Sequence, residues 1–213
     1  DWYSGLNDPT YWGDQAYSVL GQSDSAIVGY SIVNARLAAH KDSTDSDRNV
    51  IVREGNLVDN KPAFRIVNIL QGEGAIGPYS FGYLGTEPLF LTKLGVYAIT
   101  AQDITGEKYS QSRSFFLNGK LLEENGLEEA FALVYKDMYW LCLNGRAYIL
   151  DGLQATQTDR SAPYSTRQHA GFYCTNIPAR VLWEQDGALW FGTADGRLCA
   201  FANEPSDPLN YND

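Results

Sequence analysis

The amino-acid sequence predicts an all-β protein. We expect a β-propeller-like array of about four blades, each a four-stranded antiparallel sheet, standing alone or as part of a larger propeller. Aromatic residues make up 13 % of the 213 residues and glycines number 20, a combination typical of short strands joined by tight turns. A strand–turn–strand unit also recurs along the chain, and a hydrophobic content of 44 % suffices for a buried core.

The two clearest copies of this unit span residues 130–151 and 179–201. Each runs from an apolar strand through a short charged turn into an aromatic strand, then through a second turn into a third apolar strand. The second turn is Asn144-Gly145-Arg146 in one copy and Asp195-Gly196-Arg197 in the other. Asn-Gly and Asp-Gly predict hairpins, because both central residues of a type I′ turn need a positive φ.

Two looser copies precede these, at residues 27–52 and 88–117. Their expected middle strands are 35–40 and 96–101, and their expected third strands are 49–53 and 112–117. Further strands are expected between the units, at 63–70, 79–84 and 171–175, and could complete the blades as fourth strands. In the stretch 121–131 we predict a strand from Glu128 onward, since Asn125-Gly126 would interrupt a helix.

These elements divide the chain into three parts. Residues 1–26 are an N-terminal extension that we expect to pack on the domain, 27–203 are the repeats, and 204–213 are a polar tail. The expected repeat boundaries are 27–75, 76–120, 121–160 and 161–203. Repeats of about 50 residues match the usual length of a propeller blade. A β-sandwich or a simple meander is the alternative architecture.

The charge of the chain restricts its partners. A formal net charge of −10 and a pI near 4.6 argue against nucleic acid and anionic membranes, which attract clustered Lys and Arg. No apolar run approaches the roughly 20 residues of a membrane-spanning helix. Cys142, Cys174 and Cys199 lie in apolar stretches, so we interpret them as buried thiols rather than as a disulfide framework or a zinc site.

Residues that could carry chemistry do not form a recognisable motif, so we predict no catalytic, cofactor-binding or metal site. Asp42, Asp45 and Asp47 lack the central glycine and distal glutamate of a calcium loop. His40 and His169 are interpreted as surface or hydrogen-bonding residues. Carboxylates that could form the acid pair of a glycoside hydrolase are Glu73, Glu87, Asp103 and Glu184.

The aromatic residues have two interpretations. We expect Trp140 and Trp190, at matching positions of the two clear repeats, to pack between blades. Three aromatics of the N-terminal stretch, Tyr3, Tyr11 and Trp12, are expected to pin that stretch to its own domain, although they could instead stack on sugars or insert into a partner. Exposure of Trp12 or Trp183 in an acid-lined pocket would favour a sugar site. The longest polar loops, at 42–49 and 154–168, are the candidates for a binding surface.

The stretch from Tyr3 to Val33 contains Asp8-Pro9-Thr10-Tyr11-Trp12 followed by Ile27-Val28-Gly29-Tyr30, and the later stretch 82–100 is similar in style. On these motifs the chain resembles structural proteins of tailed phages and prophages of Gram-positive bacteria. The resemblance implies a virion or tail-associated assembly protein of which this chain is a repeat-domain portion. The absence of an initiator Met agrees with a processed chain or a fragment.

The expected function is therefore that of a non-enzymatic structural or interaction protein, found in a virion or in the bacterial cytoplasm. Its expected partners are other virion or assembly proteins and further copies of itself, with no cofactor. The alternative is a carbohydrate-binding or carbohydrate-active propeller, a lectin or a glycosidase. A protein-binding scaffold of the host cell would differ from the first class only in genomic context.

Overall fold

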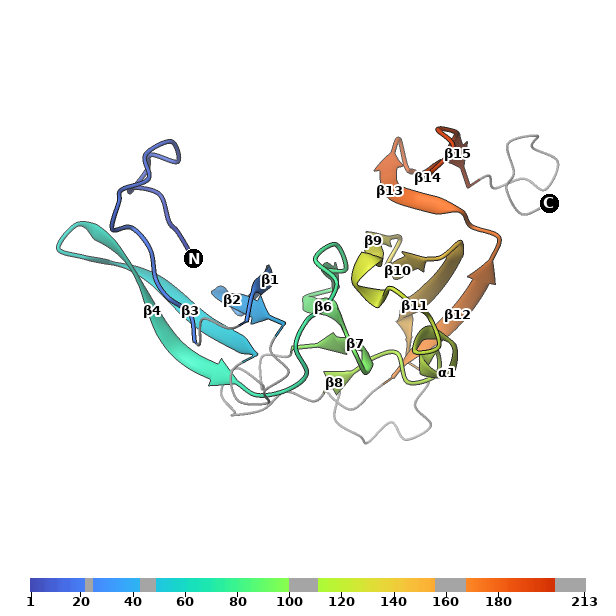
Figure 1. Ribbon diagram of the computed structural model, residues 1–213, viewed down its shortest axis with the longest axis horizontal. Coiled ribbons are helices and arrows are strands. Elements are labelled where there is room, and N and C mark those ends of the chain that lie inside the picture. The colour runs from blue at the N-terminus through green and yellow to red at the C-terminus, as the bar shows by residue number, and fades with distance from the viewer. Residues whose placement is uncertain (22–24, 43–48, 100–110, 156–167, 202–213) are drawn as a thin grey trace. The chain divides into compact units, whose positions relative to one another are not determined.

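The computed structural model describes residues 1–21, 25–42, 49–99, 111–155 and 168–201 and confirms the all-β prediction (Figure 1). Its strands form four antiparallel sheets of three or four strands. Within each sheet the strands follow one another in chain order, as in a meander. No helix of the described residues is both long and apolar enough to cross a membrane.

The first sheet contains β1 (Ile27–Val33), β2 (Arg36–Lys41), β3 (Val50–Val58) and β4 (Lys61–Leu70). Two-residue turns with positive φ, Asn34-Ala35 and Asp59-Asn60, close its first and last hairpins. β2 pairs with β3 only as far as Arg53, so beyond it β3 and β4 pair with each other alone. We call this two-stranded extension, residues 54–65, the hairpin arm (Figure 1).

The second sheet contains β5 (Gly82–Leu84), β6 (Glu87–Thr92), β7 (Gly95–Ala98) and β8 (Gln111–Ser112). The strand predicted to reach residue 117 therefore ends at Ser112. The backbone turns there because the amides of Leu117 and Asn118 both donate to the Ser114 carbonyl, which leads into the short helix α1 (Asn118–Leu121).

The strand predicted from Glu128 onward begins only at Phe131. Gly126 adopts a left-handed conformation with φ 70° and starts a 3₁₀ turn, η2 (Leu127–Glu129). The amide of Glu129 donates to the Gly126 carbonyl, and the amide of Ala130 to that of Leu127. Both glutamates of the turn are consequently held outside the sheet that follows.

The third and fourth sheets follow this turn. The third contains β9 (Phe131–Tyr135), β10 (Met138–Leu143), β11 (Arg146–Ala155) and β12 (His169–Thr175). The fourth contains β13 (Ala179–Gln185), β14 (Ala188–Thr193) and β15 (Leu198–Ala200). Because β12 pairs with β11, the third sheet extends to Thr175, beyond the expected boundary at residue 160.

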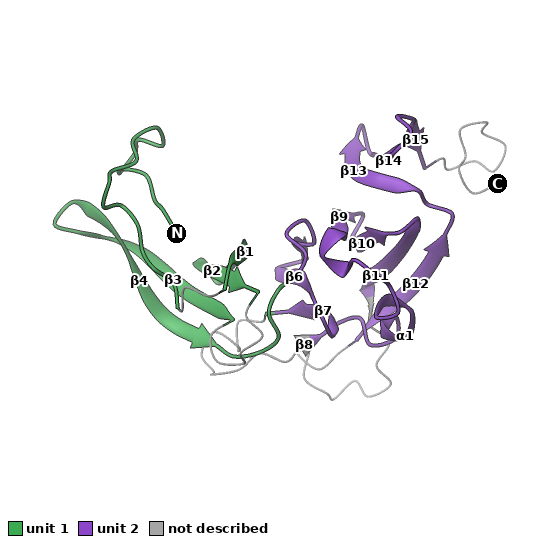
Figure 2. Ribbon diagram, viewed as in Figure 1, with its two compact units in different colours: residues 1–75, 99–110 green, residues 76–98, 111–213 purple. Residues whose placement is uncertain are grey.

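The chain forms two compact units (Figure 2). Unit 1 comprises residues 1–75 and 99–110, and unit 2 comprises residues 76–98 and 111–213. In unit 1, the side chains of Leu20, Ala39 and Ile51 form a small core on one face of the first sheet.

Unit 2 contains two larger apolar cores, one on each face of the third sheet. Along β10, Tyr139 and Leu141 point toward the second sheet, and Trp140 and Cys142 point toward the fourth. This alternation is the period-two pattern of a strand that is buried on both faces. The third sheet therefore lies between the other two sheets of its unit.

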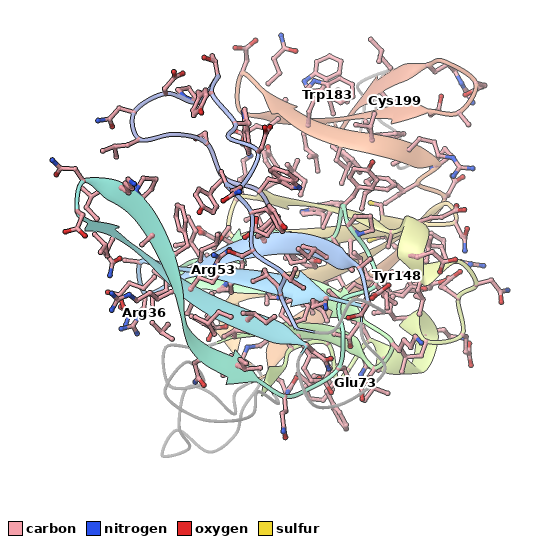
Figure 3. The ribbon with its side chains drawn as sticks, turned by 60° about the vertical axis from the view of Figure 1, so that its left-hand side comes forward. Arg36, Arg53, Glu73, Tyr148, Trp183 and Cys199 are labelled. Atoms are coloured by element: carbon pink, nitrogen blue, oxygen red, sulfur yellow. The ribbon has the colours of Figure 1, made fainter. Side chains whose placement is uncertain are left out.

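The N-terminal segment, residues 1–20, packs against β3 and β4 of unit 1. Buried Arg53 lies between them and bonds to the Asp1 carboxylate, the Ser18 hydroxyl and the Phe64 carbonyl (Figure 3). The ring of Tyr3 lies 5.1 Å from that of Phe64. Tyr3 thus helps to hold the segment in place, as predicted.

Tyr11 and Trp12, which were expected to do the same, are instead exposed. The Trp12 indole donates to the carbonyl of Pro9, and the Tyr11 ring lies against Gly5, so both contact their own segment. Their expected pinning role is therefore corrected.

We expect replacement of Leu141 by Ala to lower the free energy of unfolding by about 2–5 kcal/mol. Leu141 is fully buried between the second and third sheets, so the shorter side chain leaves a cavity. The matched control is Leu153→Ala on β11, where the leucine is 77 % exposed. Urea unfolding should show an effect within about 0.5 kcal/mol for the control, and equal effects of the two variants would contradict the placement of the core.

Candidate binding groove

Tyr79 presents an exposed aromatic ring on a fixed backbone. Its side chain is 73 % exposed, whereas its carbonyl accepts the amide of Ala132 on β9 at 2.9 Å. This bridge pairs Tyr79 with Phe131 in parallel orientation. An aromatic side chain whose backbone is already ordered can contact a ligand with little further loss of entropy.

The next residue, Ser80, is fully buried, and its hydrogen bonds fix the backbone beside Tyr79. Its hydroxyl donates to the Gly77 carbonyl at 2.7 Å and accepts the amide of Leu91 at 2.9 Å. Its carbonyl accepts the hydroxyl of Tyr139 at 2.5 Å. Burial raises the pKa of Tyr139, so this phenol stays protonated and remains a donor.

A groove runs from Tyr79 along the edges of β9 and β13. The first part of the groove has a volume of about 560 Å³ and is lined by Tyr79, η2 and the start of β13. The second part has a volume of about 370 Å³ and extends to Asn144, Thr193 and Arg197. Both parts share Glu129, Phe131 and Arg180. Volumes of this size are usual for sites that bind small molecules.

A bulge in β13 places Arg180 in the groove. Ala179 pairs with Thr193 and Val181 with Gly192, so Arg180 is an extra residue with no partner on β14. Bulges of this kind change the direction of a side chain and are frequent beside functional sites. No ion pair joins Arg180 to another described residue, although Glu129 lines the same groove.

The far end of the groove is fixed by local hydrogen bonds. The Asp195 carboxylate accepts the Thr193 hydroxyl and, at 2.8 Å, the Arg197 guanidinium. The bond from Thr193, with Arg197 nearby, lowers the pKa of Asp195 and keeps it ionised. The Asn144 amide donates to Glu124 at 3.0 Å. Charged and polar groups thus line an aromatic groove, an arrangement able to bind hydroxyl-rich ligands.

Two of the predicted chemistry-bearing residues, Glu87 and His169, belong instead to a buried cluster of unit 2. The Glu87 carboxylate accepts two hydrogen bonds from the Arg113 guanidinium, at 3.0 and 2.9 Å. Burial, and then the positive charge of Arg113, lower the pKa of His169. The residues of the cluster, Glu87, Arg113, His169 and Asp151, are all at most 6 % exposed, so we assign them to structure.

Both histidines are buried, so a surface role for them is ruled out. His40 lies on β2 and is fully buried in unit 1, where its Nε2 and the Ser31 hydroxyl share a hydrogen bond of 2.7 Å. Burial lowers the pKa of His40 to about 3. A hydrogen-bonding role, the other half of the expectation, is correct for His40.

The remaining candidates do not join the groove. The Asp42 carboxylate accepts the amide of Ala26, Glu73 lies in unit 1, and Glu184 is exposed on β13. Asp45, Asp47 and Asp103 lie outside the described residues, as does most of the two long loops at 42–49 and 154–168. Sequence reasoning missed Tyr79 and Arg180, because a strand edge and a bulge leave no local motif.

The predicted inter-blade tryptophans differ from each other. Trp140 packs in the core between the third and fourth sheets, as expected. Trp190 lies on the opposite face of the fourth sheet, where its ring stacks on Trp183 at 6.3 Å. The three cysteines are free thiols, and burial raises the pKa of Cys142 to about 12.

No protein-family model matches the chain, and no curated protein matches its sequence.

We expect the free energy of unfolding to fall as the pH decreases from about 7 to about 5. The unfolded chain binds a proton at His40 below its ordinary pKa of 6.5, whereas the folded chain does not until about 3. The contribution of His40 is therefore complete above the ordinary pKa and is lost as the pH falls, by about 1.4 kcal/mol per pH unit. His169, whose pKa is also lowered, acts in the same direction.

Urea unfolding of the wild type and of His40→Asn at several pH values measures this effect. The variant should show a shallower dependence on pH, whatever its stability at neutral pH. An unchanged slope would contradict the burial of a neutral imidazole at this position.

Proposed function

We propose that the chain is a non-enzymatic structural or interaction protein, part of a virion or tail assembly protein of a phage or prophage. The observation that carries this proposal is the number of large apolar side chains that unit 1 exposes. They lie on the N-terminal segment and on β1, β3 and β4, and they are Trp2, Leu6, Tyr11, Trp12, Tyr17, Val19, Tyr30, Ile32, Leu57, Val58, Ile66 and Val67. Exposed large apolar side chains in this number favour a protein that binds other proteins.

The hairpin arm supports this role. Past Arg53, every residue of β3 is exposed, and Leu57 and Val58 lie next to the turn at Asp59-Asn60. Two strands that pair only with each other are marginally stable in water, so packing against a partner would stabilise the arm. The arm is therefore the part of unit 1 that we assign to contact with other assembly proteins.

A propeller-like arrangement is the finer architecture that we propose. Each sheet is a meander in chain order, and in unit 2 the first strands β5, β9 and β13 are neighbours. Blades of a propeller are arranged in this way, with their first strands innermost. The resemblance of the Asp8–Trp12 and Ile27–Tyr30 motifs to phage structural proteins supports a place in a virion or, for a prophage, in the bacterial cytoplasm.

The experiment is to purify particles of the phage or prophage that encodes the chain by density-gradient centrifugation. We expect the chain to be present, and the Leu57→Lys variant to be depleted several-fold, because a charge in place of a 55 % exposed leucine on the arm opposes apolar contact. The control is Leu94→Lys in a turn of unit 2, where the leucine is 47 % exposed. Particles that lack the wild-type chain would contradict the proposal.

Carbohydrate binding is a second candidate function, and the groove of unit 2 favours it. The ring of Tyr79 can stack on the apolar face of a sugar, and the side chains of Arg180 and Glu129 can bond to its hydroxyls. Arg180 has no ion-pair partner among the described residues, so a ligand need not break a salt bridge to reach it.

For this second function, we expect Tyr79→Ala to weaken binding of an oligosaccharide about tenfold, equivalent to about 1.4 kcal/mol. The probes are cello- and chito-oligosaccharides, titrated by calorimetry. Tyr11→Ala is the matched control, because Tyr11 is 63 % exposed and belongs to unit 1. Loss of binding in the control alone would assign the sugar site to the N-terminal aromatics, and no binding of any probe would remove the candidate.

A further inference from the structure

The fourth sheet has two different faces. On the inner face, Leu182, Leu189 and Phe191 pack in the core shared with the third sheet. The residues between them point the other way, because side chains alternate along a strand. Cross-strand pairing aligns these opposite residues into three rows, which we call the outer face: Val181, Gly192 and Leu198 in the first row, Trp183, Trp190 and Ala200 in the second, and Gln185 and Ala188 in the third.

Apart from Gln185, this outer face is apolar, and it carries no charged side chain. Leu198 is 71 % exposed and Val181 is also exposed. Trp183 and Trp190 are half-buried and stack on each other, and Trp183 is visible on β13 in Figure 3. The indole nitrogen of Trp190 is buried and has no hydrogen-bond partner among the described residues. An open sheet face is usually polar, so an apolar one needs a cover.

The internal repeat indicates what kind of structure covers such a face. Residues 138–143 of β10 correspond to 188–193 of β14, which makes Trp140 the equivalent of Trp190. The face of the third sheet that carries Trp140 is covered by the next sheet, through Leu182, Leu189 and Phe191. The outer face of the fourth sheet therefore has the chemistry of a face that packs on another β-sheet.

We propose that the outer face binds the same face of a second copy of this chain, in a twofold-symmetric contact. A symmetric contact places each surface opposite its own copy, so a charged surface would repel itself. Two chains that each carry a net charge of −10 repel each other over most of their surface, and the outer face avoids this because none of its side chains is charged. This inference rests on the proposed assembly function and names one of its contacts.

The test is the mass of the purified chain in solution, measured by size-exclusion chromatography with light scattering. We expect a dimer of twice the 23.7 kDa chain at high concentration. Leu198→Lys should be a monomer, because it places a charge on the outer face at a side chain that is 71 % exposed. Leu153→Lys should remain a dimer, since Leu153 is similarly exposed at 77 % but lies on β11, away from the outer face.

Hydrogen exchange provides a second measurement that does not depend on a variant. Amides of residues 181–183 and 198–200 should exchange more slowly in the dimer than in the diluted monomer. A wild type that is monomeric at every concentration, or a Leu198→Lys variant that still dimerises, would overturn the assignment.

These results separate the contact from the function. A chain that enters particles but does not dimerise through this face refutes the contact alone. A chain that dimerises as expected but is missing from particles refutes the assembly function and leaves the contact in place.

Discussion

The hydrogen bond from the Tyr139 hydroxyl to the Ser80 carbonyl is the interaction on which unit 2 depends most. It joins β10 of the third sheet to the residues that lead into the second sheet, inside a buried apolar core. Gly82 makes room for the ring, because a Cβ at this position would lie 3.2 Å from Tyr139. A buried phenol needs a hydrogen-bond acceptor, and here the acceptor is the Ser80 carbonyl. This hydrogen bond fixes the position of Ser80, and the neighbouring side chain of Tyr79 faces solvent.

The hairpins were predictable from sequence because their cause is local. Asn144-Gly145 adopts positive φ at both positions, as its residue types indicate, and closes the hairpin that it predicts. Asp195-Gly196 also joins two paired strands, β14 and β15, but only Gly196 has a positive φ, so the predicted type I′ turn is wrong there. The meander of each sheet follows from such turns. Which strands share a sheet depends on contacts between distant residues, and for that reason β12 was assigned to a different repeat from β11, its actual partner.

Burial and site geometry were less accessible to sequence reasoning. His169 follows a polar stretch, but pairing of β12 with β11 carries it into the core beside Arg113. The groove was missed for a similar reason: Tyr79 and Arg180 are about 100 residues apart and meet through the packing of sheets. The signal that could have found it is the recurrence of the repeat, since matching the two copies places the start of β13 beside the start of β9.

Strand β13 shows how one short segment can serve two surfaces of different chemistry. The bulge at Arg180 turns a charged side chain toward the groove, and regular alternation resumes with Val181 and Trp183 on the outer face. The groove therefore offers charges and an aromatic ring, which suit a hydroxyl-rich ligand, whereas the outer face offers uncharged and mainly apolar side chains. In a chain this acidic, an uncharged face is the surface at which two copies can meet without repulsion. Ligand binding needs polar and charged side chains, whereas assembly through the outer face needs uncharged ones. Because of the pleat and the bulge of β13, Arg180 faces the groove and Val181 and Trp183 lie on the outer face.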